Sequence, residues 1–105
     1  MATLKSIGLH NINTSAQTLY TVPGTVNGGI LKEIIFSNAT SAIVKYSMII
    51  VKNGGPTVTI IPSTKLLPYE CNPASMSTFL QPGDIVQVFS DTASSVDTLL
   101  SYVEV

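Results

Sequence analysis

The chain has 105 residues and a net charge of −1, and only 10% of its residues are charged, where about 25% is usual for a soluble domain. Its five Lys are scattered and Arg is absent, so the clustered cations that nucleic-acid binding requires are missing. No run approaches the ~20 apolar residues of a membrane span, and the N-terminus lacks the pattern of a secretory signal. We therefore predict no nucleic-acid partner, no membrane partner and synthesis in a cytosol.

The chain length and the low charge content also predict the number of domains and the tendency to self-associate. A chain of this length is predicted to form one domain, residues 1–105. A surface poor in charge has weak self-repulsion and tolerates lasting contact with copies of itself, so we expect a homo-oligomer. The single cysteine, Cys71, excludes an internal disulfide and fits a reducing site of synthesis.

The first half of the chain contains strand patterns separated by turn signals. Residues 3–12 alternate loosely, so residues 1–14 are expected to form an edge strand or an arm. Residues 17–22 predict a short strand, closed by a type II turn at Val22-Pro23-Gly24-Thr25. Residues 30–37 predict another strand, and the hairpin-sized loop at 38–41 is expected to lead back into residues 42–51.

The run from Ala42 to Val51 is the strongest strand signal. Its even-numbered side is wholly apolar, whereas Lys45 and Ser47 interrupt the odd-numbered side, so the even side is predicted to face the core. Such a run would be an aggregation hazard on a free edge. We therefore predict an interior strand.

The second half continues the same pattern. The Asn-Gly pair in Lys52–Gly55 predicts a turn that tolerates two positive φ values in succession, and Gln81–Asp84 repeats the Pro-Gly turn signal. Strands are expected at 57–61, 67–71, 75–80, 85–90 and 97–105, with Asn72-Pro73 splitting the second from the third. About eight short strands and no long helix predict an all-β antiparallel β-sandwich, either jelly-roll or Ig-like.

Groups for catalysis are few. His10 and Cys71 could make a base and nucleophile pair, but the alternative of a surface histidine and a semi-buried thiol without a functional link is favoured. The six carboxylates, none within four residues of another, are Glu33, Glu70, Asp84, Asp91, Asp97 and Glu104. Asp84 is explained as the last residue of its turn and Asp91 as the start of a loop, since Asp bonds its own downstream backbone. We predict no enzyme, no metal site and no cofactor.

One aromatic residue is a candidate for a contact. Phe89 alternates with Val86 and Val88, which are expected to face inward, so its side chain is expected on the opposite face. There it would form either a subunit contact or part of a second buried layer.

Four segments, in this order, carry a family resemblance: Leu19 to Thr25 (LYTVPGT), Lys32 to Asn38, Leu80 to Val88 (LQPGDIVQV) and Ser101 to Val105 (SYVEV). Together they resemble small virion structural proteins of tailed bacteriophages, whose β-sandwich is framed by such motifs. The resemblance implies a non-enzymatic head decoration (cement) protein or tail accessory protein. It further implies many copies, often as trimers, that bind other virion proteins such as major capsid or tail proteins, and a location in the virion after synthesis in the bacterial cytoplasm.

A second hypothesis is a carbohydrate- or receptor-binding module of the phage tail or baseplate on the same scaffold. Its contacts would come from loop residues such as Asn27, Asn53, Tyr69 and Asn72. The chain has no Trp, which disfavours a sugar site, since these usually use exposed aromatic rings.

Overall fold

The computed structural model describes residues 2–105 and contains eight β-strands. These are β1 (Thr3–Leu9), β2 (Gln17–Thr21), β3 (Gly29–Asn38), β4 (Val44–Val51), β5 (Thr57–Leu66), β6 (Cys71–Leu80), β7 (Ile85–Ser90) and β8 (Val96–Glu104). The prediction of about eight short strands in an all-β fold is confirmed.

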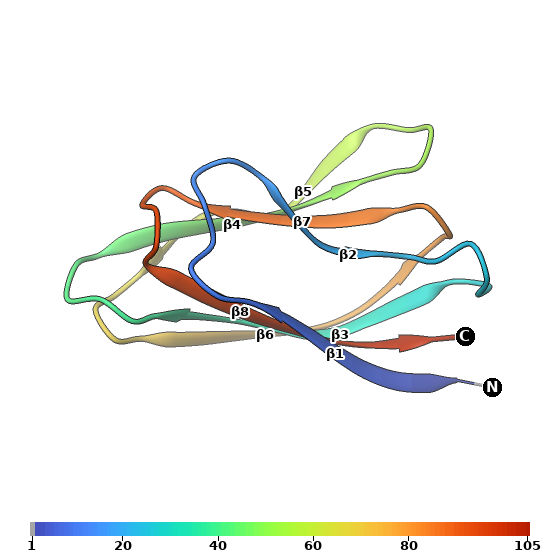
Figure 1. The fold of residues 1–105 in the computed structure, drawn as a ribbon, viewed down its shortest axis with the longest axis horizontal. Coiled ribbons are helices and arrows are strands. Elements are labelled where there is room, and N and C mark those ends of the chain that lie inside the picture. The colour runs from blue at the N-terminus through green and yellow to red at the C-terminus, as the bar shows by residue number, and fades with distance from the viewer. Residues whose placement is uncertain (1) are drawn as a thin grey trace.

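The strands form two antiparallel sheets that pack face to face (Figure 1). The first sheet has the order β1-β8-β3-β6 and the second the order β2-β7-β4-β5. Only β4 and β5 follow each other within one sheet, and every other connection passes between the sheets. An Ig-like sandwich instead pairs several consecutive strands in the same sheet. The observed order is that of a jelly roll, which decides between the two predicted architectures.

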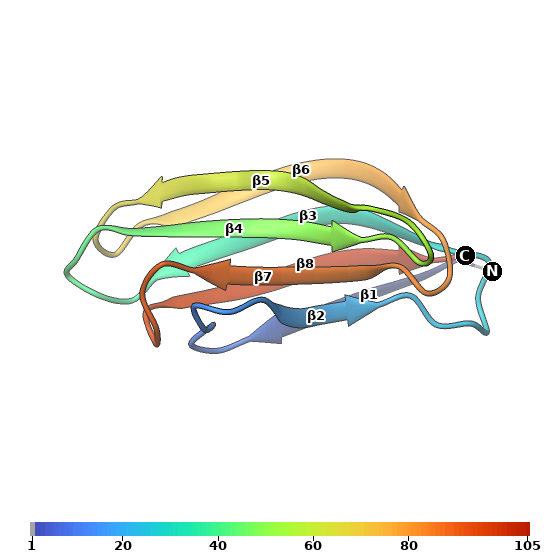
Figure 2. The same cartoon turned by 90° about the horizontal axis from the view of Figure 1, so that it is seen from above.

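The two ends of the sandwich differ. The start of β1 and the end of β8 lie side by side at one end, with the turns 22–28, 52–56 and 81–84 (Figure 2). The loops 10–16, 39–43, 67–70 and 91–95 lie at the other end, which we call the distal end.

Strand β4 confirms the central prediction. It lies between β7 and β5, so it is an interior strand, and Val44, Tyr46, Met48 and Ile50 of its even-numbered side are buried. Residues 42 and 43 precede the strand and are exposed. Burying this side removes the longest apolar strand surface of the chain from water.

The expected hairpin between residues 30–37 and 42–51 is wrong, because β3 and β4 belong to different sheets. A loop of hairpin size can also cross the ~10 Å between two packed sheets. Buried Asn38 holds this crossing: its Nδ2 donates to Ala42 O at 2.7 Å and Leu67 O at 3.1 Å, and its Oδ1 accepts from Thr40 N at 2.9 Å.

Two prolines that were expected to end or split strands lie within strands instead. Pro62 lies within β5, and Pro73 lies within β6, so the expected split at Asn72-Pro73 is wrong. Both strands are sheet edges. A proline that lacks its N–H is tolerated on an edge strand, where one side of the backbone has no neighbour.

The predicted turns are only partly confirmed. Gly83 has a φ of 90° and Asp84 N donates to Gln81 O at 3.1 Å, as in a type II turn. The type II turn at Pro23-Gly24 is wrong, because among residues 2–105 only Gly54 and Gly83 are glycines with positive φ. Val22 N instead donates to Asp84 O at 3.0 Å, so the chain first runs beside the turn 81–84 and then bends at residues 24–27. In Lys52–Gly55, only Gly54 has a positive φ, of 71°.

The core fills the space between the sheets, and two aromatic pairs bridge it. Tyr20 of β2 and Tyr102 of β8 have ring centroids 4.1 Å apart, as do Phe36 of β3 and Tyr46 of β4. Each pair joins a strand of one sheet to a strand of the other. Such contacts add about 0.5–1.5 kcal/mol beyond the burial of area, so they contribute to holding the layers together.

Candidate functional site

The only histidine lies on the surface at the end of β1. His10 Nδ1 is 2.8 Å from Asp97 Oδ1 in β8, and the same oxygen accepts from Asn11 N at 2.7 Å. Both side chains are substantially exposed. Asp97 thus holds residues 10 and 11, which follow β1, against β8 on the solvent-exposed face of the first sheet.

The structure does not bring His10 and Cys71 together. Across the first sheet, Asp97 of β8 pairs with Ser37 of β3, which pairs with Cys71 of β6, and His10 lies beyond Asp97. With strands ~4.8 Å apart, three spacings place the histidine roughly 14 Å from the thiol. A general base must come within ~3 Å of its nucleophile. Cys71 is also exposed rather than semi-buried as expected.

A cavity of about 470 Å³ opens at the end of the sandwich that carries the termini. It is lined by Thr3, Lys5, Pro23, Thr25, Val26, Asn27, Glu104 and Val105. Its charged side chains, Lys5 and Glu104, form an ion pair, with Lys5 Nζ 2.7 Å from Glu104 Oε1.

Glu104 is the best-buried charge of this cavity. Its second oxygen, Oε2, accepts a hydrogen bond from the buried Tyr20 hydroxyl at 2.7 Å. The hydrogen bonds from Lys5 and Tyr20 lower the pKa of Glu104, although burial opposes them. Burial and the neighbouring carboxylate raise the pKa of the Tyr20 hydroxyl. Glu104 therefore stays ionised and Tyr20 neutral near pH 7, which suits a structural tie between β1, β2 and β8.

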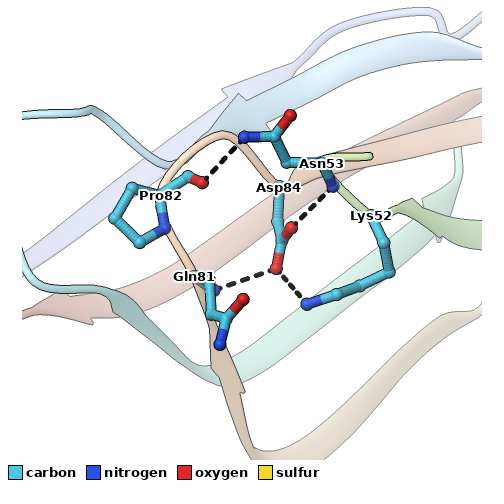
Figure 3. A network of polar contacts seen from close by, with 5 residues as sticks. All are labelled: Lys52, Asn53, Gln81, Pro82 and Asp84. Carbon is cyan, nitrogen blue, oxygen red and sulfur yellow. Dashed lines mark hydrogen bonds and ion pairs between the residues drawn. The ribbon is translucent and has the colours of Figure 1, made fainter. Parts of the chain in front are cut away.

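Asp84 joins two turns, as Figure 3 shows. Its oxygens accept from Asn53 N and Gln81 N, both at 2.9 Å, and pair with the Lys52 ammonium. Burial alone would raise the pKa of this carboxyl, but the two backbone amides and Lys52 outweigh it and hold the pKa below 3.8. Asp84 has the structural role in its turn that was expected, but its carboxylate accepts from the upstream Gln81 N and from the Asn53 N of the β4–β5 turn rather than from its own downstream backbone.

Asp91 is also used structurally, but not as expected. Its Oδ1 accepts from Lys45 N of β4 at 2.8 Å and from the Thr92 hydroxyl at 3.1 Å. The carboxylate thus anchors the β7–β8 loop to the neighbouring strand rather than to its own downstream backbone.

Phe89 lies on the outer face of the second sheet, opposite the buried Val86 and Val88, as predicted from their alternation. It is half-buried and pairs with Ser47 of β4. Subunit contact remains a prediction for this residue.

The loop residues considered for a binding module do not form one group. Asn27 and Asn53 lie at the end with the termini, whereas Tyr69 and Asn72 lie toward the distal end. Asn72 Nδ2 also donates to Tyr46 Oη at 3.2 Å, so its amide is already engaged.

Tyr69 is the most exposed aromatic residue. Its side chain is 72% exposed, and its φ is 57°. Glu70 N donates to Leu67 O at 3.1 Å, so Leu67-Pro68-Tyr69-Glu70 is a turn with tyrosine at the position that type II turns usually give to glycine. Leu67 N donates to Glu70 Oε1 at 3.0 Å and Tyr69 N to Thr40 O at 3.2 Å, which stabilise the turn. The strand predicted at 67–71 is therefore wrong, because residues 67–70 form this turn and β6 begins only at Cys71.

Within residues 2–105, no group of three or more His, Cys, Asp or Glu side chains could hold a metal ion. In the same part of the chain, no helix is long and apolar enough to cross a membrane.

No model of a known protein family and no curated protein matches this chain. Solved structures do. A chain in the acid-stable capsid structure of Helicobacter pylori bacteriophage KHP30 is similar, with a TM-score of 0.62 and 10% identity, over 99% of this chain and 87% of that one.

Chains of infectious bursal disease virus are similar as well. For the Gx strain the TM-score is 0.51 at 10% identity over 97% of this chain, and for the Gt strain 0.52 at 8% over 99%. The matched part is 32% of each of those viral chains, so this chain spans about a third of their length. At such identities the likeness establishes a shared fold.

Asp84→Asn tests the tie between the two turns. Because the folded pKa of Asp84 lies below 3.8, its carboxylate stabilises the fold above that pH, and this contribution is lost as the pH falls through the lower folded value. The variant should be less stable by about 2–3 kcal/mol at pH 7, and the difference should shrink below pH 3.8, measured by urea unfolding across pH. Glu33→Gln, at a half-exposed position, should change stability by less than about 0.5 kcal/mol. A difference for Asp84→Asn that stays constant down to pH 2 would contradict this account.

Proposed function

We propose that this chain is a non-enzymatic structural component of a tailed bacteriophage virion. In this proposal it is a small self-associating jelly roll, docked on the head as a decoration or cement protein or on the tail. The observation that carries the proposal is the likeness to a chain of a phage capsid over nearly the full length of both chains. The ordered sequence motifs support the same assignment independently.

The size of the matching chains supports a separate small component. The jelly roll makes up 87% of the similar phage chain but only 32% of the chains of infectious bursal disease virus. A fold that nearly fills its chain fits a stand-alone accessory subunit, whereas one that fills a third is part of a larger protein.

The use of polar groups supports a role without catalysis. Glu104, Asp84 and Asp91 are each engaged by donors from other segments of the chain. Catalytic acids and bases need free positions next to a substrate. The low charge of the surface fits permanent contact with other virion proteins instead. Phe89, on the outer face of the second sheet, is a candidate for contact with a neighbouring virion subunit.

Mass spectrometry of purified virions of the encoding phage tests the proposal. The chain should be present in many copies and should remain after washes that remove host proteins. Absence from virions, with the protein present in the infected cell, would overturn it. Particles separated into heads and tails then assign the location.

A second candidate, a carbohydrate- or receptor-binding module of the tail or baseplate, has one favourable observation. Tyr69 is held exposed on a hydrogen-bonded turn beside the exposed Leu67. A fixed aromatic ring suits stacking against a sugar or insertion into a receptor pocket.

Glycan arrays decide this alternative. If it holds, the wild-type chain should bind a defined set of glycans and Tyr69→Ala should lose at least about tenfold in affinity. Asn13→Ala, at another exposed loop position of the distal end, is the matched control and should bind normally. An array without hits would remove the carbohydrate version of this candidate.

A further inference from the structure

The outer face of the first sheet displays large apolar side chains. Leu4 of β1 is 75% exposed, Phe79 of β6 is 53% exposed and Leu99 of β8 is 45% exposed. Along each strand, the residues next to these side chains face the second sheet. None of the three side chains therefore belongs to the core between the sheets. These positions span the sheet from one edge strand to the other.

The register of the four strands arranges this face in three rows. The first apolar row is Leu4, Val103, Ile30 and Phe79. The second apolar row is Gly8, Leu99, Ile35 and Pro73. Between them lies the serine row, Ser6, Ser101, Glu33 and Ser75. In each row the order is β1, β8, β3, β6. The exposed bulge residue Lys32 lies beside Glu33, so two uncharged rows flank a row with two opposite charges.

The aromatic ring of the first apolar row lies close over the sheet. A Cβ on Gly28 would come within 2.4 Å of Phe79 Cζ, so the ring lies directly against the glycine backbone. Contact between Phe79 and the backbone keeps the ring in place without covering its outer side. An aromatic group with its position already fixed loses little side-chain entropy on association.

We propose that this face binds the same face of a second copy of the chain, around a two-fold axis parallel to the strands. The inference deepens the proposed function, because it names the partner and the surface for self-association. With such an axis, each row of one copy faces the same row of the partner, and the order of the strands is reversed: β1 faces the partner's β6, and β8 faces the partner's β3. Leu4 then lies over the partner's Phe79, Val103 over the partner's Ile30, and Leu99 over the partner's Ile35.

This axis keeps the charged residues of the serine row, Glu33 and the neighbouring Lys32, apart from their copies. With the axis parallel to the strands, Glu33 of β3 faces the serine of β8, Ser101, in the partner's serine row. An axis running across the strands would place Glu33 against its own copy, and like charges facing each other destabilise a contact. An isologous contact brings every residue near a copy of a residue on the same face. The arrangement therefore keeps both apolar rows paired and the two carboxylates apart.

The size of the face is sufficient for a second copy. Four strands ~4.8 Å apart and about nine residues at ~3.4 Å each give a flat area of roughly 19 Å by 30 Å. This area includes a fourth row beyond the second apolar row, Asp97, Ser37 and Cys71. Side-chain relief raises the accessible area above that flat value, close to the ~800 Å² per partner of a stable interface. Two sheets packed in this way lie ~10 Å apart, as in the interior of a sandwich.

The outer face of the second sheet differs. Its apolar side chains, such as Ile49 and Phe89, are half-buried, and threonines flank them on both edge strands. The large exposed apolar residues of that sheet, Val58 and Ile60, are confined to the edge strand β5. Two exposed lysines, Lys45 and Lys65, pair across the face. Because hydrophobic association scales with the exposed apolar area removed from water, the first sheet is the favoured side for the pair.

Light scattering with size exclusion tests the pair. The wild-type chain should have twice the mass of one 11.1 kDa chain. Leu99→Lys puts a charge in the centre of the first sheet's outer face and should give a monomer with unchanged circular dichroism. Ile49→Lys, the matched substitution on a central strand of the second sheet, should remain a dimer. A wild-type monomer or trimer, or a dimer that survives Leu99→Lys, overturns the inference.

A charge swap tests the axis. Within one chain, Leu4 and Phe79 are three strand spacings apart, ~14 Å, beyond the ~8 Å Debye length of physiological salt. In the proposed pair they face each other across the interface. Leu4→Lys with Phe79→Glu should therefore retain the dimer, with an affinity that falls as salt is added. Leu4→Lys with Phe79→Lys should give a monomer. Equal masses for the two double variants overturn the proposed pairing.

These outcomes are separate from those of the virion experiment. A chain found in virions but monomeric in solution overturns the two-fold pair and leaves the structural role intact. A dimer that is absent from virions supports the two-fold pair and overturns the structural role.

Discussion

The register of the two central strands of the first sheet, β8 and β3, is the constraint on which the rest of the molecule depends. Along β8, Val96, Thr98, Leu100, Tyr102 and Glu104 are buried against the second sheet, while the residues between them face outward. A slip of one residue would exchange the two sets, since side chains alternate along a strand. It would remove Tyr102 from Tyr20 and Glu104 from Lys5 in the same step, so the same register determines both the core packing and the partly buried ion pair.

The sequence predicted those parts of the fold that depend on neighbours along the chain. The alternation in residues 42–51 identified the buried side of β4, and Pro82-Gly83 identified the turn before β7. It did not predict which sheet each strand joins, because nearly every connection crosses between the sheets and loop length is similar for a hairpin and a crossing. It also missed the pairing of Lys5 with Glu104, which are 99 residues apart and adjacent only because β1 pairs with β8.

The candidate contact surfaces also differ in whether neighbours along the chain or strand pairing determine them. Phe89 was placed on an outer face from alternation alone, because Val86 and Val88 belong to the same strand. Leu4, Val103, Ile30 and Phe79 come from four different strands, and only the register of the sheet aligns them. In this protein most buried polar groups tie loops and strands together, which leaves the outer faces as the surfaces with chemistry still available. A small shell with this distribution is suited to assembly through its faces.

The closeness of the two chain ends has a practical consequence for engineering. Thr3 and Glu104 are direct partners in the β1–β8 ladder, so their backbones lie ~5 Å apart. A short glycine linker would join the ends without altering any strand. New ends could then be opened in the exposed residues 92–94 of the β7–β8 loop, at the distal end. Such a circular permutant would keep both layers and could carry cargo at the distal end, far from the start of β1 and the end of β8.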